Sequence, residues 1–415
     1  MFRRIRALQN EYPKQYWLLF WGMLVSTAGI SLIWPFLTIY LREKLDLPLT
    51  TIAFLITISS VATLFSSLVI GPVMDRFGRK GVMITSLFLS AVIFSLMSFA
   101  QTLPQFVILM ALRGAFAPLY SVAADAMVAD LIADKKRSEA YSLLRIINNV
   151  GIALGPAIGG FITTGSYTAA FILGSSSLAI FGLLVIFTIR ETAPALVNTS
   201  HIEDSETSGY RVLFKDNLFI SFCGSITLAR IMPALVFVLL SVYVKENFAI
   251  PESQFGFLMT TNAIIVVLFQ FSVTRLVSKL PPLRVLAFGS LIYAVGIGSI
   301  ALGENFWAFM ASMVVLTFGE LLIAPTGTTL ASQLAPAAQR GRYMSVYSLT
   351  VGIARGIGPV FGGMLNDNLS PAAIWYGGSA AGILAFIWFL GLFFQRRNRD
   401  AAENILTQTS SGDAS

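Results

Sequence analysis

Twelve long apolar runs divide the sequence, and each is about as long as a helix that crosses a lipid bilayer. A spanning helix needs roughly 20 predominantly apolar residues. Only 12% of the residues are charged, against about 25% in an average soluble protein, so most of the surface must meet lipid. We therefore expect an all-α, polytopic membrane protein with spans at 16–41, 50–73, 81–101, 104–130, 138–163, 168–190, 216–243, 253–277, 283–303, 305–332, 341–365 and 371–395.

A glycine-rich stretch occurs twice, at an offset close to half the chain. The first copy contains Gly155-Pro156 and Gly159-Gly160, and the second contains Gly358-Pro359 and Gly362-Gly363 with the same spacing. A long internal repeat indicates a duplicated architecture. The sequence thus predicts two pseudo-symmetric six-helix bundles.

The longest polar segment between the runs separates these bundles. We expect an N-terminal half at 1–190, a cytoplasmic linker at 191–215 and a C-terminal half at 216–395. The polar tail, 396–415, is expected to be cytoplasmic and disordered, because it offers little apolar surface to bury.

Basic residues are distributed unequally between the two sides of the predicted membrane. One side carries only Arg42, Lys44 and Lys245, and most of the other Lys and Arg residues fall on the opposite side. Cytoplasmic loops carry an excess of Lys and Arg. We expect both termini in the cytoplasm and the chain in the plasma membrane, which in a bacterium is the inner membrane.

The chain lacks the residue sets that enzymes and nucleic-acid-binding proteins need. It has one cysteine, Cys223, and one histidine, His201, so a soft-metal site is not expected. No phosphate-binding Gly-rich loop and no Ser/His/Asp set is evident, and the net charge of +7 comes from short clusters between apolar runs. We expect no enzyme, no cofactor, no nucleic acid and no metal. The energy source would be a proton gradient, the chain would be a monomer, and the partners would be lipid, protons and a small-molecule substrate.

The loop after the second run has the order Gly71-Pro-Val-Met-Asp75-Arg76-Phe-Gly78-Arg79-Lys80. This order, with the tandem twelve-helix layout, resembles the major facilitator superfamily over nearly the whole chain. The stretch from Gly151 to Gly160 resembles the fifth-helix signature of the proton-coupled antiporters in that family, which include multidrug exporters.

The resemblance implies that this loop is a cytoplasmic gate. Asp75 would sit at the positive N-terminal end of the eleventh helix, which would begin near Arg340. Arg79 would pair with Asp130 at the inner end of the fourth helix, and Gly71 and Gly78 would allow close backbone approach. Such a network would stabilise the outward-facing state and break when the protein opens inward.

The repeated glycines can act in two compatible ways. Gly151, Gly155 and Gly159 recur every four residues and share one helix face, which allows close packing with another helix. The simpler interpretation is tight packing, and the functional one is a rocking surface between the halves. The predicted packing or hinge positions are Gly151, Gly155, Pro156, Gly159, Gly160, Gly358, Pro359, Gly362 and Gly363.

Charged residues inside spans are costly and by default mark a function. The candidates for proton coupling or the substrate cavity are Glu320, Arg113, Arg145, Asn148, Asn149, Arg230, Arg355 and Asp125. Arg113 resembles the fourth-helix arginine of the antiporter subfamilies. For each arginine, a structural ion pair or a contact with helix carbonyls is the alternative.

Glu320 is the main candidate for proton coupling. It lies near the middle of its run, in a Gly319-Glu320-…-Pro325 pattern that resembles the tenth helix of multidrug-type family members. Removal from water disfavours the charged form of a carboxyl, so such a group can load and release a proton as its exposure alternates. The alternative is a fixed salt bridge to Arg113, Arg230 or Arg355.

These features favour a secondary active transporter that exports small amphipathic organic molecules, including drugs, in exchange for protons. A second hypothesis is proton-coupled or facilitative transport of an organic anion or a sugar, which the excess of intramembrane arginines favours. A third is a receptor or scaffold without transport, against which the complete gate loop and the buried charges argue.

Overall fold

The computed structural model describes residues 12–192, 213, 215–336 and 339–412, and the regular elements in this part of the chain are all helices. The N-terminal half contains α2 (Lys14–Ser31), η1 (Trp34–Phe36), α3 (Leu37–Leu45), α4 (Leu49–Phe99), α5 (Leu103–Leu131), α6 (Asp134–Gly165) and α7 (Tyr167–Thr188). The C-terminal half contains α9 (Asn217–Phe248), α10 (Glu252–Val277), α11 (Pro282–Ile300), α12 (Phe306–Leu334), α13 (Arg340–Asn368) and α14 (Ala373–Gly412). The predicted all-α membrane fold is confirmed.

Eleven helices in the described residues are long and apolar enough to cross a membrane, and α4 accounts for two of the twelve predicted spans. Ser66 Oγ donates to Ala115 O, and Ser86 Oγ donates to the next carbonyl, Phe116 O. In a straight helix, positions 66 and 86 would be about 30 Å apart. The chain therefore reverses between them, around Gly78, whose φ of 74° is not helical.

The first span is interrupted where the sequence reads Trp34-Pro35. Pro35 lacks an N–H and its ring clashes with the carbonyl four residues earlier, so the helix breaks there. The chain forms η1 and then resumes as α3, which ends at Leu45.

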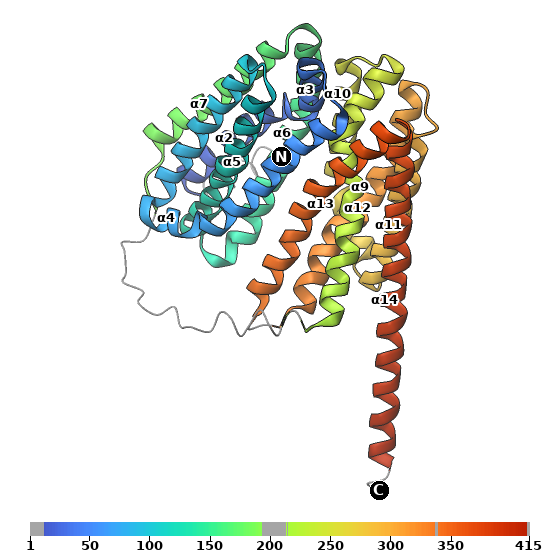
Figure 1. The fold of residues 1–415 in the computed structure, drawn as a ribbon. Helices are drawn as coiled ribbons and strands as arrows, with labels where there is room; N and C mark the ends of the chain where they lie inside the picture. Colours follow the sequence, from blue (N-terminus) through green and yellow to red (C-terminus); the bar gives the residue numbers. More distant parts are fainter. Residues whose placement is uncertain (1–11, 193–212, 214, 337–338, 413–415) are drawn as a thin grey trace.

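The two bundles lie side by side, and α4 runs next to α13 while α6 runs next to α10 (Figure 1). We call the end that carries α3 the outer end and the opposite end the inner end, following the charge asymmetry. Two of the hydrogen bonds that join the halves lie within the spans, away from the outer end. Thr260 Oγ1 donates to Ala153 O, and Thr57 Oγ1 donates to Gly356 O.

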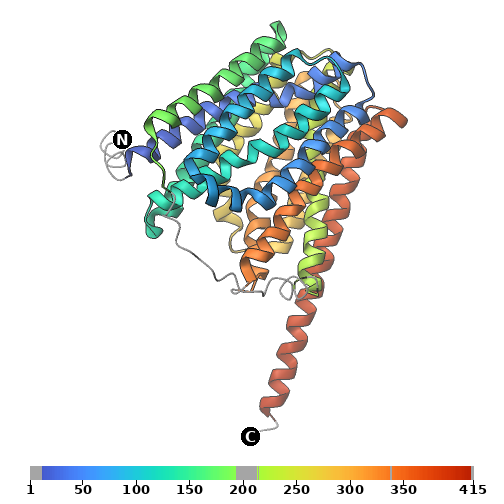
Figure 2. The ribbon, with the colours of Figure 1, turned by 60° about the vertical axis from the view of Figure 1, so that its left-hand side comes forward.

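The described part of the tail is helical, and its predicted disorder stays a prediction. Helix α14 continues to Gly412 and extends past the rest of the molecule at the inner end (Figures 1 and 2). The tail sequence contains several good helix formers, Ala, Glu, Leu and Gln, and neither Pro nor Gly before Gly412, so nothing stops the helix. Most of the predicted linker, including His201, lies outside the described residues.

The face of α6 that carries Gly151, Gly155 and Gly159 packs within its own half, as the tight-packing interpretation expects, and the rocking surface between the halves stays a prediction. A Cβ at Gly155 would lie 2.3 Å from Ser31 Cβ, and one at Gly159 would lie 2.3 Å from Leu32 O. A Cβ at Gly151 would lie 2.9 Å from Thr27 Cβ, so the three glycines lie against α2 and the residue that follows it. A helix presents several faces, and spacing alone does not say which neighbour each face meets.

The contact with the other half uses the adjacent face of α6. A Cβ at Gly160 would lie 2.5 Å from Glu252 O, and Pro156 O lies 2.3 Å from the Cβ position of Gly256. The second copy repeats this division. Gly358 and Gly362 pack on α9 of the same half, whereas Gly363 packs on Thr50 of α4, and Pro359 is buried within α13.

Candidate functional site

Glu320 projects from the middle of α12 toward α10. Asn262 Nδ2 donates to Glu320 Oε2 at 2.9 Å and to Thr317 Oγ1 at 3.0 Å. Asn262 is 6% exposed and Thr317 is fully buried, whereas Glu320 stays partly exposed. Among the described residues Glu320 forms no ion pair, so the predicted alternative of a salt bridge to Arg113, Arg230 or Arg355 is wrong.

Two of these arginines instead lie against aromatic rings and hydroxyl groups. Arg113 Cζ is 4.1 Å from the centre of the Trp34 ring, and its Nη1 donates to Ser59 Oγ at 3.3 Å. Arg230 Nη2 donates to the hydroxyl of Tyr347 at 2.5 Å. Arg355 is exposed and forms no hydrogen bond or ion pair with a described residue.

The remaining predicted cavity residues are not brought together with Glu320. The Asn148 Oδ1 atom accepts from Thr27 Oγ1 at 2.9 Å, which ties α6 to α2, and Asn149 beside it is partly exposed. Asp125 and Arg145 are exposed. The Asp125 carboxylate forms no hydrogen bond or ion pair with a described residue, although its backbone carbonyl accepts from Tyr141.

Half of the predicted inner gate is formed. Arg79 Nε lies 3.2 Å from Asp130 Oδ2, so the predicted ion pair is present. The carboxylate of Glu191, at the end of the N-terminal half, accepts from the backbone N–H groups of Arg79 and Lys80, each at 3.0 Å. Lys80 Nζ also donates to Ile186 O at 2.8 Å. The loop is therefore fixed to the inner ends of α5 and α7.

The other half of the predicted gate is open. Helix α13 begins at Arg340, as predicted, but Asp75 is exposed and forms no hydrogen bond or ion pair with a described residue. Arg76 is also exposed and lies over the Phe77 ring. A Cβ at Gly71 would meet no atom within 4 Å, so the close backbone approach expected at Gly71 is absent.

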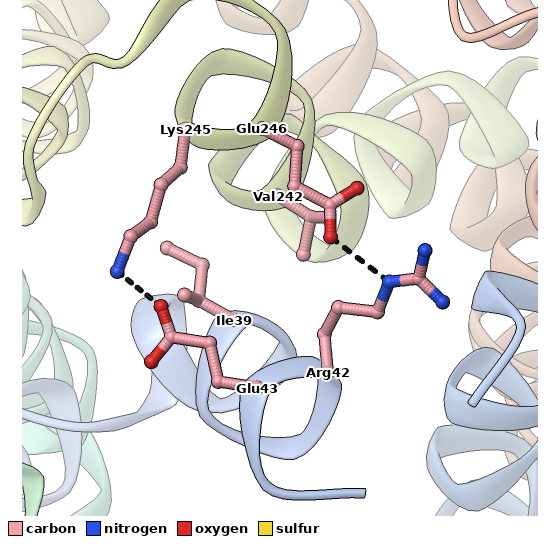
Figure 3. Close-up of a pocket in the computed structure, with 6 residues that line it drawn as sticks. All are labelled: Ile39, Arg42, Glu43, Val242, Lys245 and Glu246. Atoms are coloured by element: carbon pink, nitrogen blue, oxygen red, sulfur yellow. Dashed lines mark hydrogen bonds and ion pairs between the residues drawn. The ribbon is translucent and has the colours of Figure 1, made fainter. Parts of the chain in front are cut away.

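A cluster of ion pairs joins the two halves at the outer end, and the sequence interpretation missed it (Figure 3). Arg42 Nε binds Glu246 Oε1 at 2.9 Å, and Lys245 Nζ binds Glu43 Oε1. Both pairs connect α3 of one half to α9 of the other. They enclose a small cavity that is also lined by Ile39 and Val242.

Two further carboxylates extend this outer contact. Glu252, which is 4% exposed, accepts from Lys245 Nζ and from the hydroxyl of Tyr167, the latter at 2.5 Å. Asp367, near the end of α13, accepts from the backbone N–H groups of Leu49 at 3.2 Å and Thr50 at 2.8 Å. The Asp367 carboxylate thus caps the N-terminus of α4 in the other half, where negative charge is favourable.

The repeat contained a signal for this cluster. Arg42-Glu43 and Lys245-Glu246 are basic–acidic dipeptides at equivalent positions, with the same offset as Gly155 and Gly358. Each dipeptide pairs with the other across the interface, so the two ion pairs are related by the pseudo-symmetry of the halves.

Comparison with known proteins places the chain among membrane transporters. The Na(+), Li(+), K(+)/H(+) antiporter of Planococcus maritimus is 28% identical over 419 residues, which cover 90% of this chain and 95% of the relative. Multidrug resistance protein 1 of Bacillus subtilis (strain 168) is 24% identical, covering 84% of this chain and 89% of the relative.

Solved structures share the fold at low sequence identity. The crystal structure of the nucleoside transporter NupG superposes with a TM-score of 0.76 at 14% identity, covering 92% of this chain and 99% of that one. A bacterial homologue of the human lysosomal transporter Spinster, in an inward-facing and unoccupied conformation, gives a TM-score of 0.71 at 13% identity, covering 92% and 96%.

The sequence model of the family "Major Facilitator Superfamily" matches residues 19–243 and 225–410. Together these two matches cover nearly the whole chain. With two six-helix bundles and the gate loop in place, the chain belongs to the Major Facilitator Superfamily.

Proposed function

We propose that the chain is a secondary active transporter that exports small amphipathic organic molecules in exchange for protons, and that Glu320 carries the proton. This proposal rests on the hydrogen bonding of the Glu320 carboxyl group within its span. Its carboxyl is hydrogen-bonded to Asn262 and is not in an ion pair with any described residue. Because no cation holds the charge in place, the group can gain and lose a proton as its access to water changes.

Asn262 suits this role because it positions the carboxyl without fixing its charge. Its amide nitrogen binds both Glu320 and the buried Thr317, whose hydroxyl in turn donates to Met313 O at 2.6 Å. A neutral amide can hydrogen-bond to a carboxylate or to a carboxylic acid. Both protonation states can therefore occupy the same position.

The arrangement of the halves supports alternating access. In this fold the substrate site lies between two bundles that rock against each other. The outer ends are tied by Arg42–Glu246 and Lys245–Glu43, while Asp75 at the inner end is unpaired among the described residues. This combination supports an inward-open state, in which the predicted Asp75 contact would be broken.

We also propose the cellular setting from the charge asymmetry. The chain would lie in the plasma membrane, the inner membrane of a bacterium, as a monomer with both termini in the cytoplasm. The inner end defined above would then face the cytoplasm.

Reconstitution in liposomes with an internal pH-sensitive dye tests the coupling. Substrate addition should move protons with the native protein, and Glu320→Gln should reduce this movement at least about tenfold. Glu304→Gln is the matched control, because Glu304 is an exposed acid in the loop between α11 and α12. Substrate-driven proton movement that Glu320→Gln leaves unchanged would contradict the assignment.

The substrate panel should separate the alternative functions. It should contain dyes, antibiotics, sugars and organic acids, together with Na⁺, Li⁺ and K⁺, which the name of the Planococcus relative suggests. Substrate flux without proton movement would indicate a facilitator. No flux with any member of the panel would support the receptor or scaffold.

A further inference from the structure

Three arginines from three helices gather where the two halves meet. Arg113 belongs to α5 in the N-terminal half, whereas Arg230 and Arg355 belong to α9 and α13 in the C-terminal half. The helices that carry them are in contact through α4, because α5 packs on α4, α4 packs on α13 and α13 packs on α9. We refer to Arg113, Arg230 and Arg355 as the arginine cluster.

Arg113 and the residue that follows Arg355 contact the same turn of α4. Arg113 binds Ser59 Oγ, and the neighbouring Gly114 packs on Ser59 O. On the other side of that turn, the carbonyl of Gly356 accepts from Thr57. The turn from Thr57 to Ser59 thus brings arginines of opposite halves close together.

Arg355 is carried on the face of α13 that is turned toward the other half. Gly352 and Gly363 on the same helix pack on Leu64 and Thr50 of α4, and residues three or four positions apart share a helix face. Arg355 is nevertheless exposed and forms no hydrogen bond or ion pair with a described residue. Its guanidinium is thus a free donor at the interface of the halves.

Arg230 joins the cluster from α9. The next residue, Ile231, and Ala234 about one turn further along α9 pack on Gly358, which lies one turn beyond Arg355 on α13. Arg230 is held by Tyr347, whose ring centre is 5.0 Å from Arg230 Cζ. The Nε atoms of Arg230 and Arg113 are buried and have no hydrogen-bond partner.

The described residues supply no carboxylate to this cluster, because none lies in an ion pair with Arg113, Arg230 or Arg355. Charges inside membrane proteins are normally paired, since an unpaired charge in a low-dielectric region is costly. Guanidinium groups bind planar oxyanions with paired N–H donors. These unpaired guanidinium groups are therefore suited to bind an anionic ligand reversibly.

We propose that Arg113, Arg230 and Arg355 bind the anionic group of an amphipathic organic anion, whose apolar part lies beside Trp34 and Tyr347. The substrate would carry a carboxylate or sulfonate on an aromatic or aliphatic body. This proposal rests on the proposed transport function and specifies its substrate class. It also explains why a cationic drug is a poor candidate, since the cluster would repel it.

Binding of matched probes to the native protein tests the proposal without requiring transport. Isothermal titration calorimetry in phosphatidylcholine nanodiscs should compare 1-naphthoate, 1-naphthalenesulfonate, 1-naphthamide and 1-naphthylmethylammonium. A zwitterionic bilayer avoids competition from anionic lipid headgroups, and added phosphatidylglycerol shows whether such a headgroup occupies the site instead. The two anions should bind at least about tenfold more tightly than the amide, and the cation should bind most weakly.

Variants locate the binding to the cluster. Arg355→Gln and Arg113→Gln should weaken anion binding by about ten- to one hundredfold, as expected for loss of a charged hydrogen-bond partner. Arg113→Lys should retain part of the affinity. Arg284→Gln is the matched control, because Arg284 is an exposed arginine that stacks on Phe393 at the inner end of α11. Arg355 has no described partner, so its replacement should leave the fold intact.

The outcomes separate this proposal from the coupling proposal. Glu320→Gln should keep anion binding while losing proton movement. If both anions bind no more tightly than the amide, or if Arg355→Gln and Arg284→Gln behave alike, the anion site is wrong. The proposal is also wrong if neither naphthyl anion binds in the zwitterionic bilayer.

Discussion

The carboxylate of Glu191 occupies the space where a side chain at position 78 would begin. A Cβ on Gly78 would lie 2.3 Å from Glu191 Oε2, and the φ of Gly78 is 74°, in the left-handed region. The same carboxylate binds the backbone N–H groups of Arg79 and Lys80. The end of the N-terminal half therefore determines how the chain turns between the second and third spans.

Gly78→Ala should consequently lower stability. The left-handed conformation costs a non-glycine residue about 1–2 kcal/mol, and the clash with Glu191 adds to this cost. Gly71→Ala is the control, since a Cβ there meets no atom within 4 Å and alanine favours a helix. Thermal unfolding in detergent should show a lower Tm for Gly78→Ala only. Equal Tm values for the two variants would contradict the strain argument.

The ion pair between Arg42 and Glu246 should hold the outer end closed. We expect Glu246→Arg to increase labelling of a cysteine placed at Ile39, a residue that lines the outer cavity, by about 1.4- to fivefold. That range follows from the roughly 0.2–1 kcal/mol typical of an exposed pair. Labelling with a membrane-impermeant maleimide in a Cys223→Ser background measures the change.

The reversed pair supplies the decisive comparison for this gate. Arg42→Glu combined with Glu246→Arg should restore slow labelling, because the charges again attract. Lys44→Glu makes the same charge change on α3 at an exposed residue with no ion pair among the described residues, and it should have no effect. Failure of the double variant to restore slow labelling would argue against a direct gate role for this pair.

Lys245 should matter more for stability than Arg42. Lys245 neutralises Glu252, which is 4% exposed, whereas the Arg42–Glu246 pair is largely accessible. Lys245→Met would leave a buried carboxylate without its cation, at a cost of about 1–3 kcal/mol. Thermal unfolding should show a larger loss of Tm than for Arg42→Met. Adding Glu252→Gln should recover most of the loss, and a double variant less stable than Lys245→Met would disprove this account.

Substitution of two adjacent glycines on α6 should have different effects, one on stability and the other on opening of the outer end. Gly159→Ala places a Cβ against Leu32 in the same half and should lower Tm. Gly160→Ala places one against Glu252 in the other half, so it should favour opening of the outer end and faster labelling at position 39. Identical behaviour of the two variants in both assays would show that the two faces do not have separate roles.

The sequence predicts the features that depend on neighbours along the chain. The start of α13 near Arg340 follows from the span boundaries, and the Arg79–Asp130 pair follows from the resemblance of the loop to that of the superfamily. The position of Glu320 within its span follows from hydropathy alone. These features need no knowledge of how distant helices pack.

Other features depend on which helix faces meet. Spacing places Gly151, Gly155 and Gly159 on one face, but only the packed structure shows that this face meets α2. Asn262 lies far from Glu320 in sequence, so periodicity could not identify it as the hydrogen-bond partner. To predict the outer ion pairs, the equivalent positions of the two halves would have to be compared for charged residues as well as for glycines.

The exchange of partners between Arg42-Glu43 and Lys245-Glu246 bears on the ancestry of the protein. If the two halves descend from one six-helix unit, two identical copies of that unit would meet around a twofold axis, where each surface contacts its own copy. A basic–acidic dipeptide on the first helix of such a unit would then form both ion pairs by itself. An outer closure could therefore have existed in a homodimer before gene fusion, and the later divergence of arginine to lysine would have preserved it.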